Sequence, residues 1–140
     1  MGKNADAHRA ALEHWNRRDF GARVSTLVNN FTHEDRASGR TVTSRDEFKA
    51  WVEDWAKAFP DGRLSEISCI DSDDASVAII MMSGTNDGPF GPFPPTGRKV
   101  EFRFCEVMRY DREGRVVSGE LFFDLLSVMV QLGHVQPPTG

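Results

Sequence analysis

The chain has 140 residues, 39% of them hydrophobic and 27% charged, with a formal net charge of −4 at pH 7. This size suits one domain, and we expect a single domain over residues 1–140 with its core at about 5–133. The acidic balance argues against nucleic acid or an anionic membrane surface as the main partner, and no apolar stretch approaches the roughly 20 residues of a membrane-spanning helix.

The first residues and the cysteines indicate the compartment. Residues 1–6, Met-Gly-Lys-Asn-Ala-Asp, lack the apolar core of a signal peptide, so we expect a cytoplasmic protein. Cys69 and Cys105 are isolated in strand-like segments. Two free thiols are therefore expected rather than a disulfide.

The N-terminal part of the chain predicts helices. Residues 5–18 carry an apolar stripe at helical spacing that includes Ala7, Ala11 and Trp15. Asp19 is expected to cap a second helix, because apolar residues again follow at helical spacing, namely Phe20, Val24, Leu27, Val28 and Phe31.

A third helix is predicted by its start and stop signals. Ser44 and Glu47 form a capping box, and Pro60-Asp61-Gly62 ends the helix. One face of this helix carries large apolar side chains: Phe48, Trp51, Val52, Trp55 and Phe59.

After residue 62 the apolar period changes to that of strands. Strands are predicted over 64–70, 75–83, 99–110 and 115–123, with turns at 71–74 and 111–114. Residues 84–97 contain four prolines and are expected to form an ordered loop. A short helix is predicted over about 125–132, ended by Gly133. Helices followed by antiparallel strands indicate an α+β fold, in which a strongly curved sheet wraps around the helices like a cone and encloses a pocket.

Asp124 is the principal candidate for chemistry. Its carboxylate lies inside the apolar run 119–130, which holds one other acid, Glu120, near its start. In an apolar wall its pKa would rise and it could act as a general acid/base. The alternative is that it caps the helix that follows.

The hairpin of residues 99–123 predicts which side chains share a face. If Tyr110 lies opposite Arg115, then Arg103 faces Phe122, and Arg103, Cys105, Glu120, Phe122 and Asp124 share a face with mixed chemistry that suits a pocket. The opposite face is more apolar and suits an interface: Phe102, Phe104, Leu121 and Phe123. A slip of one residue would reverse the two faces.

The histidines and the proline-rich loop supply further candidates. His33 is either a pocket residue or a surface loop residue, whereas His8, His14 and His134 are expected in solvent. The sequence offers no recognisable zinc spacing, so we expect neither metal nor cofactor. The candidate ligand contacts are Trp15, Trp51, Trp55, Asn86, Phe90, Phe93, Cys105, Glu120 and Phe122.

Several motifs together resemble one known family. They are Ser83-Gly84-Thr85, Pro94-Pro95-Thr96-Gly97-Arg98 and Phe123-Asp124 followed by Gln131-Leu132-Gly133, supported by residues 15–20 and 58–62. In this order and spacing they are similar to the SnoaL-like polyketide cyclases of the NTF2-like, ketosteroid isomerase-like superfamily. The resemblance implies a conical α+β barrel with a pocket and a homodimer formed through the outer face of the sheet. It also implies that Asp124 is the acid/base of a cofactor-free intramolecular aldol closure.

The chain departs from this family at two places. It has Ser118-Gly119-Glu120 where many members have a His-Trp pair, and Asn86 where a histidine is common.

Three hypotheses for function follow. The first is a polyketide cyclase or related isomerase that uses Asp124, with His33 and Arg103 as further catalytic candidates. The second is water activation, as in epoxide opening, by Asp124 and Arg103 with Glu120 as a third group. The third is a ligand-binding carrier without catalysis. In each case the expected ligand is a small hydrophobic or aromatic molecule.

Overall fold

The computed structural model describes residues 2–138. The helices are α1 (Lys3–Asn16), α2 (Phe20–Val24), α3 (Arg45–Ala58) and α4 (Leu125–Leu132). The strands are β1 (Leu27–Asp35), β2 (Thr41–Val42), β3 (Arg63–Asp71), β4 (Ala75–Thr85), β5 (Lys99–Tyr110) and β6 (Val116–Phe123). The predicted α+β class is confirmed. Among residues 2–138, no helix has both the length and the apolar character needed to cross a membrane.

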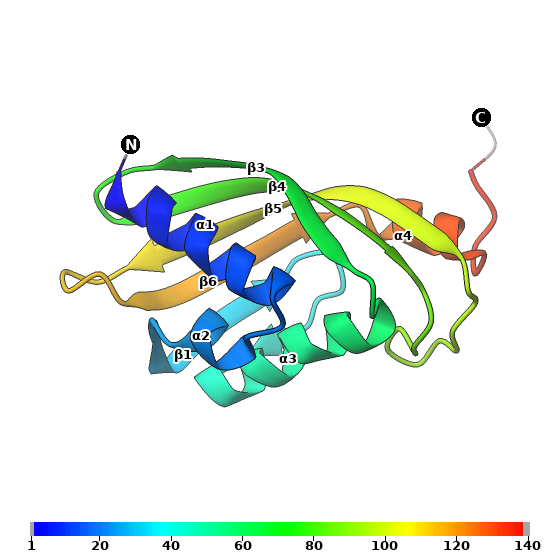
Figure 1. The fold of residues 1–140 in the computed structure, drawn as a ribbon, viewed down its shortest axis with the longest axis horizontal. Coiled ribbons are helices and arrows are strands. Elements are labelled where there is room, and N and C mark those ends of the chain that lie inside the picture. Colours follow the sequence, from blue (N-terminus) through cyan, green and yellow to red (C-terminus); the bar gives the residue numbers. More distant parts are fainter. Residues whose placement is uncertain (1, 139–140) are drawn as a thin grey trace.

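The six strands form one curved, unclosed sheet in the order β2-β1-β6-β5-β4-β3. The helices α1, α2 and α3 lie along one side of this sheet, and α4 follows β6 at its far end (Figure 1). All neighbouring strands are antiparallel except β1 and β6, which are parallel. The sheet is therefore mixed, which corrects the expectation of a purely antiparallel one.

Local sequence signals explain most helix ends. The Ser44 side chain accepts a hydrogen bond from the Glu47 backbone N–H at 3.1 Å and starts α3. Asp19 caps α2 by accepting from the Ala22 N–H at 3.1 Å. Gly133 ends α4 in the left-handed conformation at φ 87°, which glycine adopts without a steric cost.

The second helix is much shorter than predicted. It ends at Val24, and the chain then enters β1, so the expected helical spacing through Phe31 is wrong. The reason is that Leu27 and Phe31, four residues apart, face the core in a strand as well as in a helix. His33 and Asp35 continue the same inward alternation.

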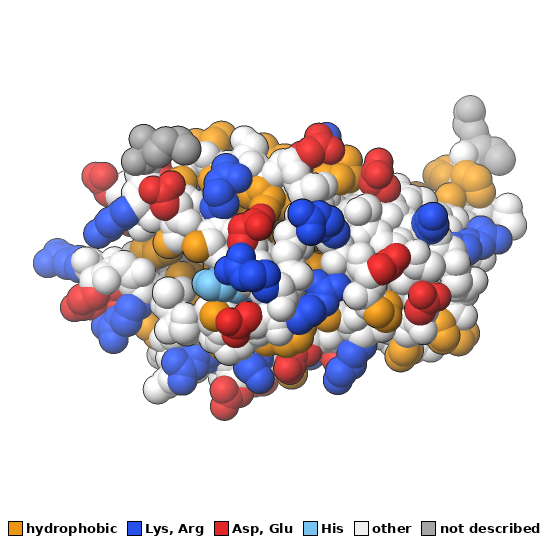
Figure 2. Space-filling view, viewed as in Figure 1, with side chains coloured by type: hydrophobic (Ala, Val, Ile, Leu, Met, Phe, Trp, Pro, Cys, Tyr) orange, Lys and Arg blue, Asp and Glu red, His pale blue; other side chains and the backbone are white. Residues whose placement is uncertain are grey.

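The surface of the molecule carries charges of both signs. Acidic and basic side chains intermingle over the face shown in Figure 2, with apolar side chains between them. The large apolar side chains gather instead between helices and sheet, where Phe31, Phe48 and Phe59 are fully buried. The concave side of the sheet is thus the site of the core.

Candidate functional site

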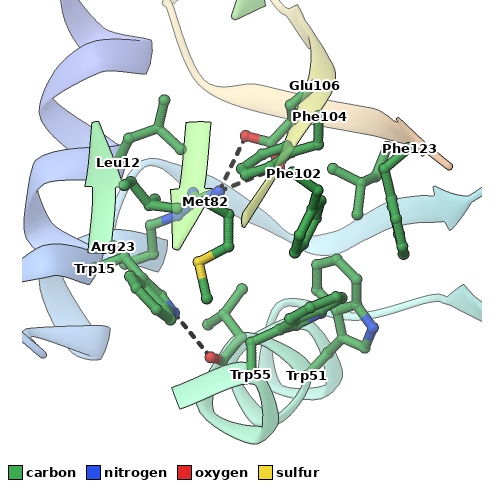
Figure 3. A pocket seen from close by; sticks show the side chains of 13 residues that line it. Leu12, Trp15, Arg23, Trp51, Trp55, Met82, Phe102, Phe104, Glu106 and Phe123 are labelled. Carbon is green, nitrogen blue, oxygen red and sulfur yellow. Dashed lines mark hydrogen bonds and ion pairs between the residues drawn. The ribbon is translucent and has the colours of Figure 1, made fainter. Parts of the chain in front are cut away.

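A cavity of about 60 Å³ lies between the helices and the concave face of the sheet. Aromatic and aliphatic side chains from α1, α3 and strands β3–β6 form most of its wall (Figure 3). A water molecule needs roughly 10–15 Å³ of such space, so the cavity holds only a few. A larger ligand must therefore extend beyond it. The lining residues are Leu12, Trp15, Arg23, Trp51, Val52, Trp55, Leu64, Met82, Phe102, Phe104, Glu106, Leu121 and Phe123.

A wider groove of about 650 Å³ adjoins the cavity. The proline-rich loop, α3, the β1–β2 turn (residues 35–40) and the start of α4 form its walls. Trp51, Trp55 and Phe123 line both spaces and so separate them. A ligand that passes these three aromatic side chains could occupy both spaces at once.

A buried charged cluster closes the inner end of the cavity. Glu106 on β5 lies with its Oε1 2.9 Å from His8 Nε2 on α1 and 3.3 Å from Arg23 Nη2 on α2. His33 on β1 places its Nε2 3.7 Å from Glu106 Oε2. All four side chains are buried. Arg23 and Glu106 are the charged residues among the described side chains that line the cavity (Figure 3).

The cluster keeps Glu106 ionised. Burial alone would raise the pKa of this carboxyl, but the Arg23 charge, the nearby His33 imidazole and the hydrogen bond from His8 hold it far below its usual value. The Arg23 guanidinium also lies 5.1 Å from the centre of the Phe48 ring, where the aromatic face stabilises its charge.

A chain of polar groups continues from the cluster toward α1. His8 Nδ1 lies 2.7 Å from Ser76 Oγ, and Ser76 Oγ lies 2.7 Å from the Tyr110 hydroxyl oxygen. The Tyr110 hydroxyl donates to the Asn4 carbonyl at 3.2 Å. This chain anchors the N-terminal helix to strands β4 and β5.

His33 is the least satisfied member of the cluster. Its ring packs against Phe48 and Trp51, with centroids 4.7 and 4.9 Å away. Its Nε2 is buried without a hydrogen-bond partner in residues 2–138, because 3.7 Å to Glu106 exceeds hydrogen-bond range. The sequence left His33 between a pocket and a surface position; the structure buries it beside the cavity wall.

Asp124 does not face the cavity. Its side chain is exposed and accepts a hydrogen bond from the Ser127 backbone N–H at 3.0 Å, which caps α4. The expectation of an inward, low-dielectric setting is therefore wrong. The adjacent Phe123 and Leu125 point into the groove instead.

The predicted faces of the β5–β6 hairpin are reversed. The observed pairing places Cys105, not Arg103, opposite Phe122, a shift of two residues that preserves which side chains share a face. Phe102, Phe104, Leu121 and Phe123 line the cavity, because the face with more large apolar side chains gains more from burial. The other face points outward and includes four predicted site residues: Arg103, Cys105, Glu120 and Phe122.

These outward residues have other partners. Arg103 is exposed and pairs with Glu66 on β3 at 3.0 Å. Glu120 pairs with Arg36 at 2.9 Å. Cys105 has a free thiol on the outer face, and Cys69 is also unpaired, as predicted.

The remaining predicted contacts divide between the cavity and the groove, with one exception. Trp15, Trp51 and Trp55 line the cavity, and Phe90 and Phe93 line the groove. Asn86 contacts neither space.

Asn86 instead holds the proline-rich loop together. It is fully buried; its Nδ2 donates to the Gly88 carbonyl at 2.8 Å, and its Oδ1 accepts from the Thr96 N–H at 2.9 Å.

Three residues of the cluster escaped the sequence analysis: His8, Arg23 and Glu106. His8 was expected in solvent but is buried. A signal existed, because His8 shares a helical stripe with Leu12 and Trp15 at spacings of four and seven. Glu106 alternates with Phe102 and Phe104 on the inward face of β5, so the correct facing of that strand would have revealed it.

Comparison with known proteins places the chain among small α+β proteins. The SnoaL-like polyketide cyclase family model matches residues 5–132. Among curated proteins, none matches the chain.

Three solved structures illustrate the similarity. AclR from Streptomyces galilaeus, to which a hydroxylase function is attributed, is 25% identical with a TM-score of 0.83, covering 99% of this chain and 86% of that one. IdmH from Streptomyces antibioticus, to which a polyketide cyclase function is attributed, is 20% identical with a TM-score of 0.78, covering 94% of this chain and 99% of that one. A protein from Catenulispora acidiphila with a ketosteroid isomerase-like fold, in complex with trimethylamine, is 16% identical (TM-score 0.77; 100% and 99% covered).

Proposed function

The chain belongs to the SnoaL-like polyketide cyclase family, and on this premise we propose that it converts a small, largely apolar carbonyl compound by acid–base chemistry of its own side chains. The observation that carries the proposal is the apolar cavity with Arg23 and Glu106 at its inner end. Such a site excludes water from the apolar part of a ligand and offers a few convergent polar groups to its carbonyl oxygens.

Arg23 is assigned to the substrate oxygen. One terminal nitrogen of its guanidinium contacts Glu106, and a guanidinium has five N–H donors in all. The remaining donors can hold an oxygen atom that gains negative charge as an enolate forms. Fixed donors in a water-poor cavity stabilise such charge far more than donors in water.

Glu106 and His33 are assigned to the proton. Glu106 lines the cavity, but a carboxylate held so firmly in its ionised form is a weak proton acceptor. His33 Nε2 lies 3.7 Å behind it without a partner, so it can take the proton onward. In this sequence of steps the proton leaves the carbon alpha to a carbonyl, passes to Glu106 and rests on His33.

The proton then returns to complete the reaction. The enolate carbon attacks a second carbonyl of the same molecule, a carbon–carbon bond forms, and the resulting alkoxide takes the proton back. In an isomerase the proton would return to a different carbon of the enolate. The aromatic wall contributes by folding the flexible substrate so that its reacting carbons meet.

The experiment that tests this function needs no knowledge of the natural substrate. The α-protons of 2-tetralone, a bicyclic aromatic ketone, are followed by NMR in D₂O with and without the protein. We expect faster exchange with wild type, since general acid–base catalysis gives about 10²–10⁴-fold. We expect most of the gain to be lost in Glu106→Gln and in His33→Asn, and none in Arg109→Gln, which removes an exposed charge from the same strand. Exchange at the buffer rate with folded wild type would overturn the proposal.

A ligand carrier is the second candidate, and one observation favours it. Asp124 caps α4 and Phe90 packs over Trp55 with ring centroids 5.3 Å apart, so the groove is roofed while the predicted acid/base faces solvent. Saturable quenching of tryptophan fluorescence by 2-tetralone without α-proton exchange would support this candidate over the enzyme.

We also propose that two copies pair through the outer face of the sheet. Ile79, Cys105 and Phe122 form a row across β4, β5 and β6. Ile79 and Phe122 remain 40% and 42% exposed, which is high for large apolar side chains that neighbour one another. A homodimer would cover this row.

A further inference from the structure

We infer that Asp35 binds a hydroxyl group of the ligand in the groove, so that the substrate class is a carbonyl compound with a hydroxyl group at its far end. This inference rests on the proposed function, because it describes a second contact of the same ligand. The observation that carries it is a buried carboxyl group with one oxygen that no group in residues 2–138 binds.

Asp35 lies at the end of β1 with its side chain on the inner face of the sheet. The residue is 4% exposed and lines the groove. It follows His33 by two positions, and residues two apart in a strand point to the same face. Because His33 packs against Trp51 of α3, the Asp35 side chain points into the same space between the sheet and α3.

One oxygen of this carboxyl group holds the turn that follows β1. Oδ1 accepts hydrogen bonds from the backbone N–H groups of Ala37 at 2.9 Å and of Ser38 at 3.1 Å. Aspartate is common in such turns, because its side chain binds the backbone two residues on. The turn therefore explains Oδ1 but gives no role to the second oxygen.

The second oxygen, Oδ2, is free to bind a ligand. Within the part of the chain that the structure describes, it accepts no hydrogen bond and forms no ion pair, yet it is not among the side-chain atoms that are sealed inside the protein without a partner. Since the Asp35 side chain is buried and lines the groove, Oδ2 opens toward the groove. When an apolar ligand displaces water from the groove, an acceptor that stays unpaired there costs free energy.

Asp35 and Glu106 lie in one row across the sheet. Leu121 on β6 pairs with Glu106 on β5 and with Asp35 on β1. Residues paired in this way point to the same face, and Leu121 lines the cavity between them. Because neighbouring strands are spaced by about 4.8 Å, the backbones at Asp35 and Glu106 are about 10 Å apart. A ligand with two fused rings can therefore place a carbonyl group near Glu106 and a hydroxyl group near Asp35.

A hydroxyl group suits this oxygen better than a cationic group does. A hydroxyl both donates and accepts, so it pairs with a carboxyl group whether or not that carboxyl carries a proton. The charged residues that line the groove within residues 2–138 are two acids, Asp35 and Asp54, and two bases, Arg40 and Lys57. This balance gives the groove no excess of acid that would attract a cation.

The test compares three ketones with the same bicyclic frame: 2-tetralone, 6-hydroxy-2-tetralone and 6-methoxy-2-tetralone. The 6-position lies at the opposite end of the frame from the ketone, and a methoxy group cannot donate a hydrogen bond. Dissociation constants are measured by isothermal titration calorimetry. We expect the hydroxy ketone to bind wild type about tenfold more tightly than either of the other two, because it alone offers Oδ2 a donor.

Asp35→Asn isolates the second oxygen. Asparagine keeps an oxygen for the backbone N–H groups of Ala37 and Ser38 but places an NH₂ donor where Oδ2 was. The preference for the hydroxy ketone over the methoxy ketone should then fall to about twofold or less, since an NH₂ group can donate to both. The matched control is Asp46→Asn, which removes an exposed acid of α3 outside the cavity and the groove and should keep the full preference.

The outcomes separate the hydroxyl contact from the proposed function. If 6-hydroxy-2-tetralone binds wild type no more tightly than the other two ketones, or if folded Asp35→Asn keeps the full preference, the hydroxyl contact is wrong, and α-proton exchange of 2-tetralone still decides the proposed function. If Asp35→Asn does not fold, the comparison of the three ketones in wild type decides. A preference for the hydroxy ketone without α-proton exchange would overturn the proposed function and leave the hydroxyl contact in place. If none of the three ketones binds to folded wild type, both fail.

Discussion

The free energy of unfolding of cluster variants provides the sharpest test of the charge balance. The perturbations are Arg23→Met, which keeps the length of the side chain without its charge, and Glu106→Gln, which keeps the shape of the carboxyl group. Both residues are buried and lie 3.3 Å apart at their closest atoms, so neither loss can be repaired by solvent.

The expected magnitudes follow from what each variant leaves behind. Removing one partner of a buried ion pair costs about 3–5 kcal/mol. Arg23→Met leaves the buried Glu106 carboxyl without its cation, but this carboxyl can take up a proton and keep its hydrogen bond with His8, so the cost should lie near the lower end, about 3 kcal/mol. Glu106→Gln leaves the Arg23 guanidinium, which cannot release its proton, buried without its carboxylate, so its cost should lie near the upper end, about 5 kcal/mol.

The assay is equilibrium unfolding in urea at pH 7, followed by tryptophan fluorescence and by circular dichroism. The double variant Arg23→Met with Glu106→Gln should cost less than the sum of the two single variants, because it leaves neither a carboxylate nor a guanidinium buried without its partner. Arg109→Gln should stay within about 0.5 kcal/mol of wild type. The reasoning is refuted if Arg23→Met destabilises more than Glu106→Gln, or if either costs less than about 1 kcal/mol.

Three further predictions concern pH, the helix cap and the outer face. The pKa of Glu106 is lowered on folding from its ordinary value of about 4.5. The stabilisation that the ionised carboxylate provides is therefore complete above that pH and is lost as the pH falls. In acid titrations, wild type should lose stability between about pH 5 and 2 more steeply than Glu106→Gln. Asp124→Ala should lower the free energy of unfolding by about 1 kcal/mol, because it removes the cap of α4. Asp124→Asn should lower it less and should leave α-proton exchange intact. Loss of exchange in Asp124→Asn would show that this carboxylate is the acid/base after all. Phe122→Glu should convert a dimer to monomers in sedimentation velocity, and wild type sedimenting as a monomer would contradict the proposed pairing.

The parts of the fold that depend on neighbours along the chain could be predicted from the sequence. The Ser44 cap, the stop after α3 and the turn at 111–114 all depend on residues within a few positions, and each appears as predicted. Strand β1 was missed because Leu27 and Phe31 fit two periods equally well. Only the pairing with β6, nearly 90 positions away, decides between them.

The site was harder to predict because its members are distant in sequence. Alternation along β5 groups Phe102 with Phe104 but does not say which side of the sheet the helices cover. The sequence-based prediction assumed that the face with ionisable residues lines the pocket, and it therefore chose Arg103 and Asp124. In the structure the face with the phenylalanines lines the cavity, because burying those side chains is more favourable. Trp51 and Trp55 were identified because their helix has one clear apolar face.

The span of the charged cluster has a consequence for how the chain matures. Its members stand at positions 8, 23, 33 and 106, and their contacts bridge separations of 83 and 98 residues. On the ribosome, Arg23 emerges long before Glu106, the carboxylate that pairs with it. The N-terminal helices therefore cannot pack against the complete sheet until most of the polypeptide has been released. Long-range closure of this kind slows folding and exposes apolar strands in the meantime. The charged cluster at the inner end of the cavity therefore forms late, and this small protein folds only when most of its chain is present.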